Sequence, residues 1–549
     1  MRTILRKIRV IFTRIFVFVI LIAIIVGVAG LLTDFDFIGN SPTDTSFIIP
    51  TPSGAVTYNI NGRVLSWVAD GDFPGNHNSA NPGVLYLMDG STRPEVALAL
   101  PSGTTRVHAC GEQSTSPNGQ YFSFFVGSAV GSIYTMDGQN TPHEVADNIN
   151  AISCSGSGTL QYSDDGSVMG YLALQVVTTG DTLNSGTLNL VNTNGFSPLS
   201  NFNIPDNVVA YDMRGDKVVY VQVLSEGRNA VISVWDDGEL EELPSLAING
   251  ENSCSFRTAQ VSLTPNDNVA VLLGERCPGG DSTRWSVNVA RASGGSFSEI
   301  TTDEVTGSYF PESRTGRIFA TDDSESIYFT VPDGVTRRTV EINQLVFADN
   351  EQNTWAEHGT MPRYNNNASL YYSTTEQVSP ALALDESLWA IVASDPDGEI
   401  SIGVFNLVDG EEEPIDINPI FAGETVKSMA FSPTDPFLLY VAGADSEEEE
   451  NTLYVLNSNG VNEALVRGNF VHLALSPDGQ FIALTEWQFP ERAGQPNYIN
   501  MVVLDLSNPN SARQLMFAGA HVTDDGDVQN QQFIYPLSWR PAPPTEAQN

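Results

Sequence analysis

Apolar and polar residues alternate along most of this chain in short runs that flank tight turns. The clearest run extends from His472 to Trp487 (HLALSPDGQFIALTEW), with alternate apolar positions on both sides of the turn Ser476–Gly479. Alternation with a period of two predicts a half-buried strand. Pro477 and Gly479 suit the turn, because proline fixes φ and glycine accepts a positive φ. The run therefore predicts a β-hairpin.

Weaker copies of this hairpin recur along the sequence. They lie at Tyr58–Ala69, Ser114–Val126, Gln161–Leu174, Tyr211–Val223, Val261–Gly274, Phe319–Val331, Leu382–Ser394 and Met429–Val441. A third strand and an edge-like fourth strand follow many copies, as in Gly131–Gly138 and His143–Ala146. Four strands per repeat, with almost no helical periodicity, describe a propeller blade.

The hairpins predict an all-β fold, a single β-propeller over residues 55–541. Because propellers typically have about 4–8 blades, the nine hairpins favour about 8 four-stranded blades, within a range of 7–9. Phe533–Pro541 is typical of an innermost strand and would close the ring by joining the first blade. Ala55–Asn59 competes for that same position, and residues 542–549 form a tail.

The repeats resemble the TolB-type, WD-like propeller repeat, which also occurs in the propeller domains of prolyl-oligopeptidase-type proteins. Three segments carry the resemblance: the turns Ser476–Gly479 and Ser116–Gly119, and the strand Leu85–Gly90 (LYLMDG). The turns Asp322–Glu325 and Leu384–Ser387 depart from the pattern, since both lack proline and glycine. The resemblance implies the propeller architecture and carries no catalytic residues.

The N-terminal region predicts a membrane anchor. Residues 1–14 are basic, and the apolar run Ile15–Leu32 approaches the roughly 20 residues that span a bilayer. Positive charge on its N-terminal side predicts a single-pass protein of the cell membrane, with the bulk of the chain extracytoplasmic. A cleaved signal peptide is the alternative, with small residues at Gly27–Ala29, but the apolar run is long for one. Residues 33–54 form a polar, proline-containing linker.

The charge balance argues against anionic partners. The chain has 66 acidic and 25 basic residues, a formal net charge of −41. Nucleic acids and anionic lipid headgroups bind proteins through lysine and arginine, so neither is expected as a partner of the exported part. The acidic surface is also compatible with simple solvation and no specific partner.

Four cysteines in an exported chain predict two disulfides. Cys254 and Cys277 lie symmetrically about the turn Thr264–Asp267, so an unbulged hairpin would place them opposite each other. Cys110 and Cys154 each precede an innermost strand of consecutive repeats and would meet between neighbouring blades. A metal site is the alternative, but no C-x-x-C and no paired histidines support it.

Candidate ligand-binding residues lie in long loops on the face opposite the hairpin turns, where binding is usual on a rigid scaffold. They are Arg106, His108, Tyr364, Tyr371, Tyr372, Trp487 and Arg492. Ordinary variable surface loops are the alternative interpretation. The sequence contains no G-x-S-x-G elbow, no segment for an α/β-hydrolase domain and no paired metal-binding histidines.

Two acidic loops offer a possible calcium site, and no other cofactor is expected. The candidate ligands are Asp395, Asp397, Glu399, Asp524, Asp525 and Asp527. The complete calcium-binding helix–loop–helix pattern is missing, and Asp-Gly is also common turn chemistry.

These observations favour a membrane-anchored, extracytoplasmic propeller that acts as a binding scaffold for a protein or glycan. One alternative is a propeller enzyme, a glycan hydrolase or lyase with its site at the channel mouth. That function would require converging carboxylates or a His–Arg pair. A sensor ectodomain is the other alternative. The sequence favours a binding role over an enzymatic one.

Overall fold

The structure is a computed structural model. It describes residues 58–542 apart from a series of segments, the longest being 72–79, 151–159, 175–184, 307–317, 363–380 and 407–414. Between residues 300 and 425 it describes backbone strands and few side chains. The predicted anchor 15–32, residues 1–14, the whole linker 33–54 and residues 543–549 of the tail lie outside this description. Within it, no helix is long and apolar enough to cross a membrane.

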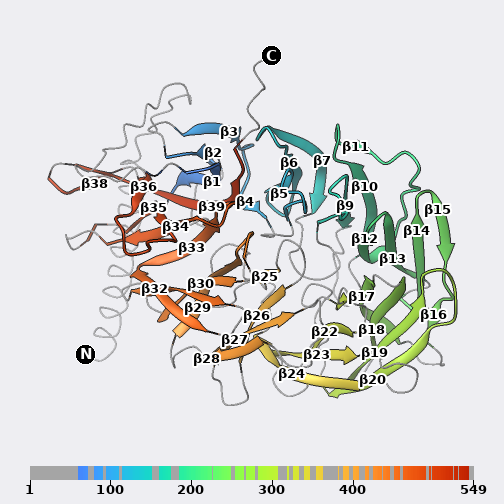
Figure 1. Ribbon diagram of the computed structural model, residues 1–549. Coiled ribbons are helices and arrows are strands. Elements are labelled where there is room, and N and C mark those ends of the chain that lie inside the picture. The colour runs from blue at the N-terminus through green and yellow to red at the C-terminus, as the bar shows by residue number, and fades with distance from the viewer. Residues whose placement is uncertain are drawn as a thin grey trace, which may run out of the picture. The chain divides into compact units, whose positions relative to one another are not determined.

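Antiparallel strands follow one another around the described residues (Figure 1). They form nine consecutive units of four, one more than the eight favoured from the sequence. Units 1–3 consist of β39 (Gln532–Arg540), β1 (Arg63–Asp70), β2 (Val84–Met88) and β3 (Glu95–Ala99); β4 (Arg106–His108), β5 (Phe122–Gly127), β6 (Val130–Met136) and β7 (Pro142–Asn150); and β8 (Gln161–Tyr162), β9 (Val168–Leu174), β10 (Gly186–Asn192) and β11 (Ser197–Pro198). The strands of each unit are named in order from the innermost to the outermost. Innermost here means the first strand of the predicted blade.

Units 4–6 follow the same order. They consist of β12 (Val208–Arg214), β13 (Lys217–Leu224), β14 (Asn229–Asp236) and β15 (Glu239–Glu242), with β16 (Leu246–Ala247) also paired to β14; β17 (Ser255–Leu263), β18 (Asn268–Arg276), β19 (Ser282–Arg291) and β20 (Ser298–Thr306); and β21 (Ile318–Ala320), β22 (Ser326–Pro332), β23 (Thr339–Val346) and β24 (Thr354–Pro362).

Units 7–9 complete the series. They consist of β25 (Ala381–Leu382), β26 (Leu388–Ser394), β27 (Ile400–Asn406) and β28 (Ile415–Pro419); β29 (Glu424–Phe431), β30 (Phe437–Ala444), β31 (Asn451–Asn457) and β32 (Asn462–Gly468); and β33 (Phe470–Leu475), β34 (Phe481–Gln488), β35 (Tyr498–Asp505) and β36 (Gln514–Phe517). A short extra hairpin, β37 (His521–Val522) with β38 (Val528–Gln529), lies between β36 and β39. Single residue pairs between β10 and β12 and between β24 and β26 join units 3 and 4, and units 6 and 7, into larger sheets.

The last strand completes the first unit. β39 pairs antiparallel with β1 from Arg63↔Arg540 to Asp70↔Gln532, as expected for Phe533–Pro541. Of the competing segment Ala55–Asn59, the structure describes only Tyr58, which has a different partner. The backbone N–H of Tyr58 donates to Gln514 Oε1 of unit 9 at 2.6 Å. The innermost pair of each of units 3–9 overlaps one of the predicted hairpins. In unit 2 the innermost strand is β4, which precedes the predicted hairpin Ser114–Val126, and within that hairpin Thr115 and Phe122 form only an isolated bridge.

The hydrophobic core is a series of clusters between neighbouring units. One cluster joins units 4 and 5 through residues such as Val219 and Val261, and another joins units 8 and 9 through Leu439 and Ile482. Unit 9 packs in the same way on unit 1, where Met501 and Trp539 belong to one cluster. Since inner strands such as β13 and β18 contribute buried apolar side chains at successive positions, and so to both faces of their sheets, a unit buries its core only between two neighbours.

The predicted Ser-Pro-Asp-Gly turn forms as expected. Ser476 Oγ donates to Asp478 Oδ1 at 2.6 Å and accepts from the Phe481 backbone N–H at 2.9 Å. Gly479 has φ 66°, in the left-handed region that glycine adopts without strain. The turn Ser116–Gly119 repeats this arrangement with Asn118 in place of the aspartate.

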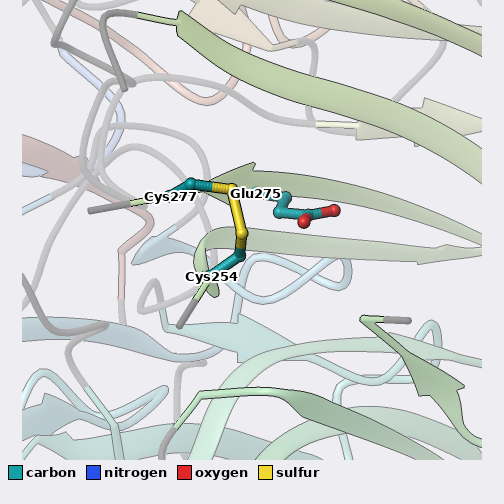
Figure 2. A group of neighbouring side chains, drawn as sticks. All are labelled: Cys254, Glu275 and Cys277. Atoms are coloured by element: carbon teal, nitrogen blue, oxygen red, sulfur yellow. A yellow bond between two sulfur atoms is a disulfide. The ribbon is translucent and has the colours of Figure 1, made fainter. Parts of the chain in front are cut away.

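The predicted Cys254–Cys277 disulfide is confirmed (Figure 2). The expected unbulged hairpin, however, is wrong. Around the turn, Leu263 pairs with Val269, a register that would place Pro278 opposite Cys254. A register shift between Phe256 and Thr258 then brings Ser255 opposite Arg276, which places the two cysteines opposite each other. Cys110 and Cys154 lie outside the described residues, so their bond stays a prediction.

Candidate binding face

The strand order divides the connections between two ends of the units. Because consecutive strands are antiparallel, the first–second and third–fourth connections of a unit lie at one end, here called the hairpin-turn face. The second–third connections and the links between units lie at the other end, here called the opposite face. The predicted binding loops belong to the opposite face.

Polar groups of the hairpin-turn face are used to connect neighbouring units. The contacts are Asn118 Nδ2 to Asp165 O (3.0 Å), Gly215 N to Asp164 Oδ2 (2.8 Å), Leu263 N to Asp212 Oδ2 (2.8 Å) and Lys217 Nζ to Asp267 Oδ1 (2.6 Å). They link units 2 to 3, 3 to 4 and 4 to 5 in succession. At this end of the described units, these polar groups therefore stabilise the contacts between neighbouring units.

A buried arginine extends this network from unit 1 to unit 2. Arg540, at the end of β39, is 1% exposed, and its Nη2 donates to Gln120 O at 2.6 Å. Its guanidinium lies 5.8 Å from the Phe122 ring centroid. Burial lowers the pKa of Arg540 to about 10, so the side chain stays charged at neutral pH. Asn140 Nδ2 adds a bond to Pro541 O at 3.2 Å. Sequence analysis missed Arg540, whose only signal was a charged residue within an apolar strand.

Three predicted ligand-binding residues gather around one cluster near the opposite face. Arg106 begins β4, and Trp487 lies one residue before the end of β34. Trp487 and Val107 belong to the same hydrophobic cluster, and Arg106 and His108 flank Val107. Trp487 and His108 are each only 5% exposed, whereas Arg106 is half-buried. Of these three side chains, Arg106 is therefore the most accessible to a ligand.

Tyr364, Tyr371, Tyr372 and Arg492 lie outside the described residues, and their ligand-binding role stays a prediction.

Two histidines on innermost strands are neutral at physiological pH. Burial, reinforced by the charge of Arg106, lowers the pKa of His108 to about 4. Burial also lowers the pKa of His472 to about 3. The His472 ring meets the Tyr535 ring edge-on, with centroids 4.7 Å apart. The His–Arg pair required for an enzyme thus exists as Arg106 and His108, but the imidazole is buried.

The β37–β38 hairpin is a feature of the opposite face that sequence analysis did not predict. Its turn is closed by the Thr523 N–H, which donates to Asp527 O at 2.9 Å. Gln495, from the connection between β34 and β35, holds it through Nε2, which donates to Gly526 O at 2.8 Å and Asp527 Oδ1 at 3.0 Å. Phe489 and Val522, on these two segments, are 36% and 42% exposed. Gln495 thus joins two segments that each carry an exposed apolar side chain.

The predicted calcium ligands are only partly described. Asp525 and Asp527 are exposed and belong to the hydrogen-bonded β37–β38 turn. Asp395, Asp397, Glu399 and Asp524 lie outside the described residues. A calcium site therefore stays a prediction.

Comparison with known proteins gives matches among solved structures only. No family model matches the sequence, and no curated protein matches it as a relative. Similar solved structures are dipeptidyl peptidase 4 of Porphyromonas gingivalis (10% identity, covering 75% of this chain and 60% of that one, TM-score 0.40), the β-propeller domain of the trilobed protease of Pyrococcus furiosus (11%, 65% and 100%, 0.29) and a putative TolB of Agrobacterium tumefaciens (14%, 55% and 91%, 0.29). They include the TolB type whose repeat the sequence resembles.

Proposed function

We propose that the chain is a membrane-anchored, extracytoplasmic propeller of nine blades that binds a protein or glycan partner on its opposite face. The nine four-stranded units, packed in succession, with unit 9 against unit 1, support a closed ring. The basic residues 1–14 and the apolar run Ile15–Leu32 support the anchor and the export of the ring.

The observation that carries the binding role is the pinned β37–β38 hairpin. Gln495 fixes its turn, and Phe489 and Val522 remain exposed on the two joined segments. A segment held in place before binding loses little conformational entropy when a partner docks. The polar groups of the hairpin-turn face, by contrast, already connect one unit to the next.

Site-specific photo-crosslinking tests this proposal in cells that carry the full chain. A photoreactive phenylalanine analogue at Phe489 or Val522 is expected to yield a crosslinked species of higher mass. The same analogue at Pro117 or Gln480, on the hairpin-turn face, is the matched control and should yield none. Crosslinking at the control positions alone would contradict the assignment of the binding face. Glycan digestion of the crosslinked species then distinguishes a glycan partner from a protein.

Membrane extraction tests the anchor separately. The full chain is expected to stay with the membrane fraction in alkaline carbonate, while protease added outside intact cells degrades the propeller. Recovery of a soluble form that lacks Met1–Ala29 would instead show a cleaved signal peptide.

A further inference from the structure

We infer that Cys254, Glu275 and Cys277 form a redox-gated site for a thiolate-binding divalent metal ion such as zinc. When the disulfide is reduced, the two sulfur atoms and the neighbouring carboxylate become three ligands for one ion. When it is oxidised, the same sulfur atoms bond to each other and the ion is released.

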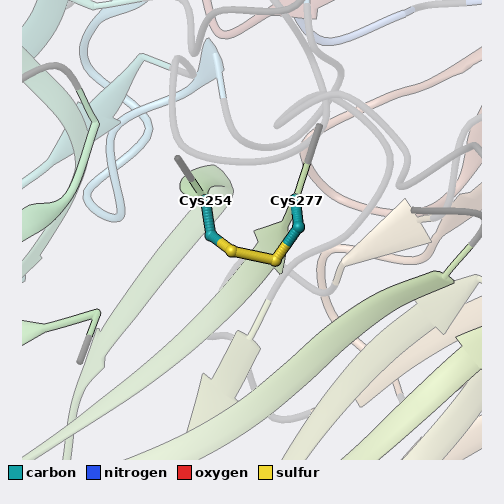
Figure 3. The surroundings of a disulfide bond; sticks show 2 residues. All are labelled: Cys254 and Cys277. Atoms are coloured by element: carbon teal, nitrogen blue, oxygen red, sulfur yellow. A yellow bond between two sulfur atoms is a disulfide. The ribbon is translucent and has the colours of Figure 1, made fainter. Parts of the chain in front are cut away.

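The β17–β18 register brings the three side chains together. Cys277 lies two residues after Glu275 in direct continuation of β18, so both side chains point to one face. Cys254 precedes β17 and lies opposite Cys277, bonded to it (Figure 3). One sulfur atom from each cysteine and a carboxylate oxygen of Glu275 all lie within 4.8 Å of one another. Among the described residues, this is the group of three such side chains close enough to hold a metal ion.

The spacing suits a tetrahedral ion after reduction. Two thiolates bound to zinc at about 2.3 Å each stand roughly 3.7 Å apart in a tetrahedral site. The backbone holds the two Cα atoms 3.9 Å apart, so rotation of the side chains can supply this separation without moving the strands. Cys254 is buried, and Glu275 and Cys277 are half-buried, which leaves the fourth ligand position for water.

Charge and ligand type select the metal. Two thiolates, one carboxylate and a divalent ion sum to one negative charge, which Arg284, paired with Glu275 across β18–β19, can offset. Soft sulfur ligands favour zinc or cobalt over calcium or magnesium.

A dithiol reductant first converts the disulfide to two thiols and is itself oxidised to a disulfide. The metal ion then displaces the two thiol protons. Later, a small-molecule disulfide takes up two electrons and two protons to become two thiols, which re-forms the Cys254–Cys277 bond and frees the ion.

Cobalt binding to the detergent-solubilised full chain tests this inference. Cys110→Ser/Cys154→Ser serves as the parent, so that Cys254 and Cys277 are its only sulfhydryl groups. After reduction with a phosphine, cobalt titration is expected to produce a sulfur-to-cobalt charge-transfer band at one ion per chain. The oxidised parent should show no band, and neither should the reduced parent carrying Cys277→Ser.

The carboxylate is tested by a matched pair of variants. Glu275→Gln is expected to weaken cobalt binding by at least about tenfold, because it removes an anionic ligand. Glu299→Gln, which alters another glutamate beside Arg284, should bind as the parent does. Equal binding by Glu275→Gln and the parent, or no band in the reduced parent, would overturn the inference. So would loss of β-sheet circular dichroism on reduction, since the site requires the β17–β18 pairing.

Discussion

At the scale of single residues, several buried polar side chains make contacts that the sequence pattern did not predict. Arg540 and His472 lie in mainly apolar strands, and His108 follows the buried Val107 in the short strand β4. Periodicity predicted the strands, but it could not predict which segments surround a given side chain. Arg540 meets Gln120, which is 420 residues away in sequence. Such contacts depend on how the units assemble.

Removing the Arg540 side chain should destabilise the fold strongly. Arg540→Ala leaves the Gln120 carbonyl without its donor and opens a cavity beside Phe122, so we expect a loss of roughly 2–4 kcal/mol of unfolding free energy. Arg63→Ala is the control. It breaks an exposed ion pair with Glu95, and a loss of about 0–1 kcal/mol is expected. Urea denaturation of both variants measures the difference, and equal losses would contradict the role given to Arg540.

The buried histidines predict loss of stability at mildly acidic pH. Their folded pKa values, about 4 and about 3, lie below the unfolded value of 6.5, so below pH 6.5 the unfolded state binds protons that the folded state does not. The two histidines therefore contribute their whole stabilisation above pH 6.5. That contribution to the free energy of unfolding decreases as the pH falls toward the folded pKa values. We expect each histidine to lower the free energy of unfolding by about 2 kcal/mol between pH 7.5 and pH 5. The loss should be somewhat smaller for the partly exposed His472.

The matched control for this pH dependence is His108→Gln/His472→Gln. Both replacements keep a polar side chain and remove the titration. Urea midpoints at the two pH values should differ less in the double variant than in the parent. A drop of the same size in both proteins would assign the pH dependence to other groups.

At the scale of elements, the turn residues made the hairpins predictable from the sequence. Register shifts and very short strands were not predictable in the same way. Proline and glycine in Ser476–Gly479 fixed a hairpin that the structure confirms. The disulfide was predicted correctly although its hairpin is irregular, because the offset at the turn and the register shift near Phe256 cancel. The β37–β38 hairpin was missed because its strands have two residues each, too few for periodicity.

Two glycines in equivalent turns provide a matched test of turn packing. Gly119 and Gly479 have φ values of 68° and 66°. An added Cβ meets nothing within 4 Å at Gly119, whereas at Gly479 it would collide with Thr434 Oγ1. We expect Gly119→Ala to cost about 1 kcal/mol from backbone strain alone, and Gly479→Ala to cost about 1 kcal/mol more.

A double variant separates the two contributions. Adding Thr434→Ala to Gly479→Ala should recover the extra cost, because it removes the colliding hydroxyl. Thermal melts of the single and double variants supply the comparison. No recovery would mean that Thr434 is not the obstacle.

At the scale of the whole molecule, the closing strand and the net charge govern stability. β39 supplies the innermost strand of unit 1 and buries Phe533, Ile534 and Arg540. The sequence predicted this closure from Phe533–Pro541. It did not fix the number of units, since the turns near residues 322 and 384 lack proline and glycine and blur the repeat boundaries.

Truncation tests the closing strand directly. A chain that ends at Gln531 loses β39, and we expect it to aggregate or unfold, because β1 and the apolar faces of units 1 and 9 become exposed. A chain that ends at Ala542 keeps β39 and should melt as the full chain does. A folded, monomeric chain without β39 would contradict the closure.

Salt should stabilise the chain. The 66 acidic residues outnumber the 25 basic residues by 41, so repulsion between carboxylates exceeds what the basic side chains can offset. Added NaCl shortens the Debye length from about 10 Å at 0.1 M to about 3 Å at 1 M and screens their repulsion. We therefore expect a higher melting temperature in 1 M NaCl. A lower one would show that attraction between opposite charges dominates.

The β1–β39 pairing also sets the order of events during biosynthesis. Asp70 and Gln532 are joined by a hydrogen bond although 462 residues separate them in sequence. At about 5–20 residues per second, roughly 20–90 s of synthesis separate the appearance of the two strands. Throughout that interval β1 has an open edge and unit 1 has three strands. The segment made first is therefore completed last, and its exposed edge during translation is where a chaperone has the most to protect.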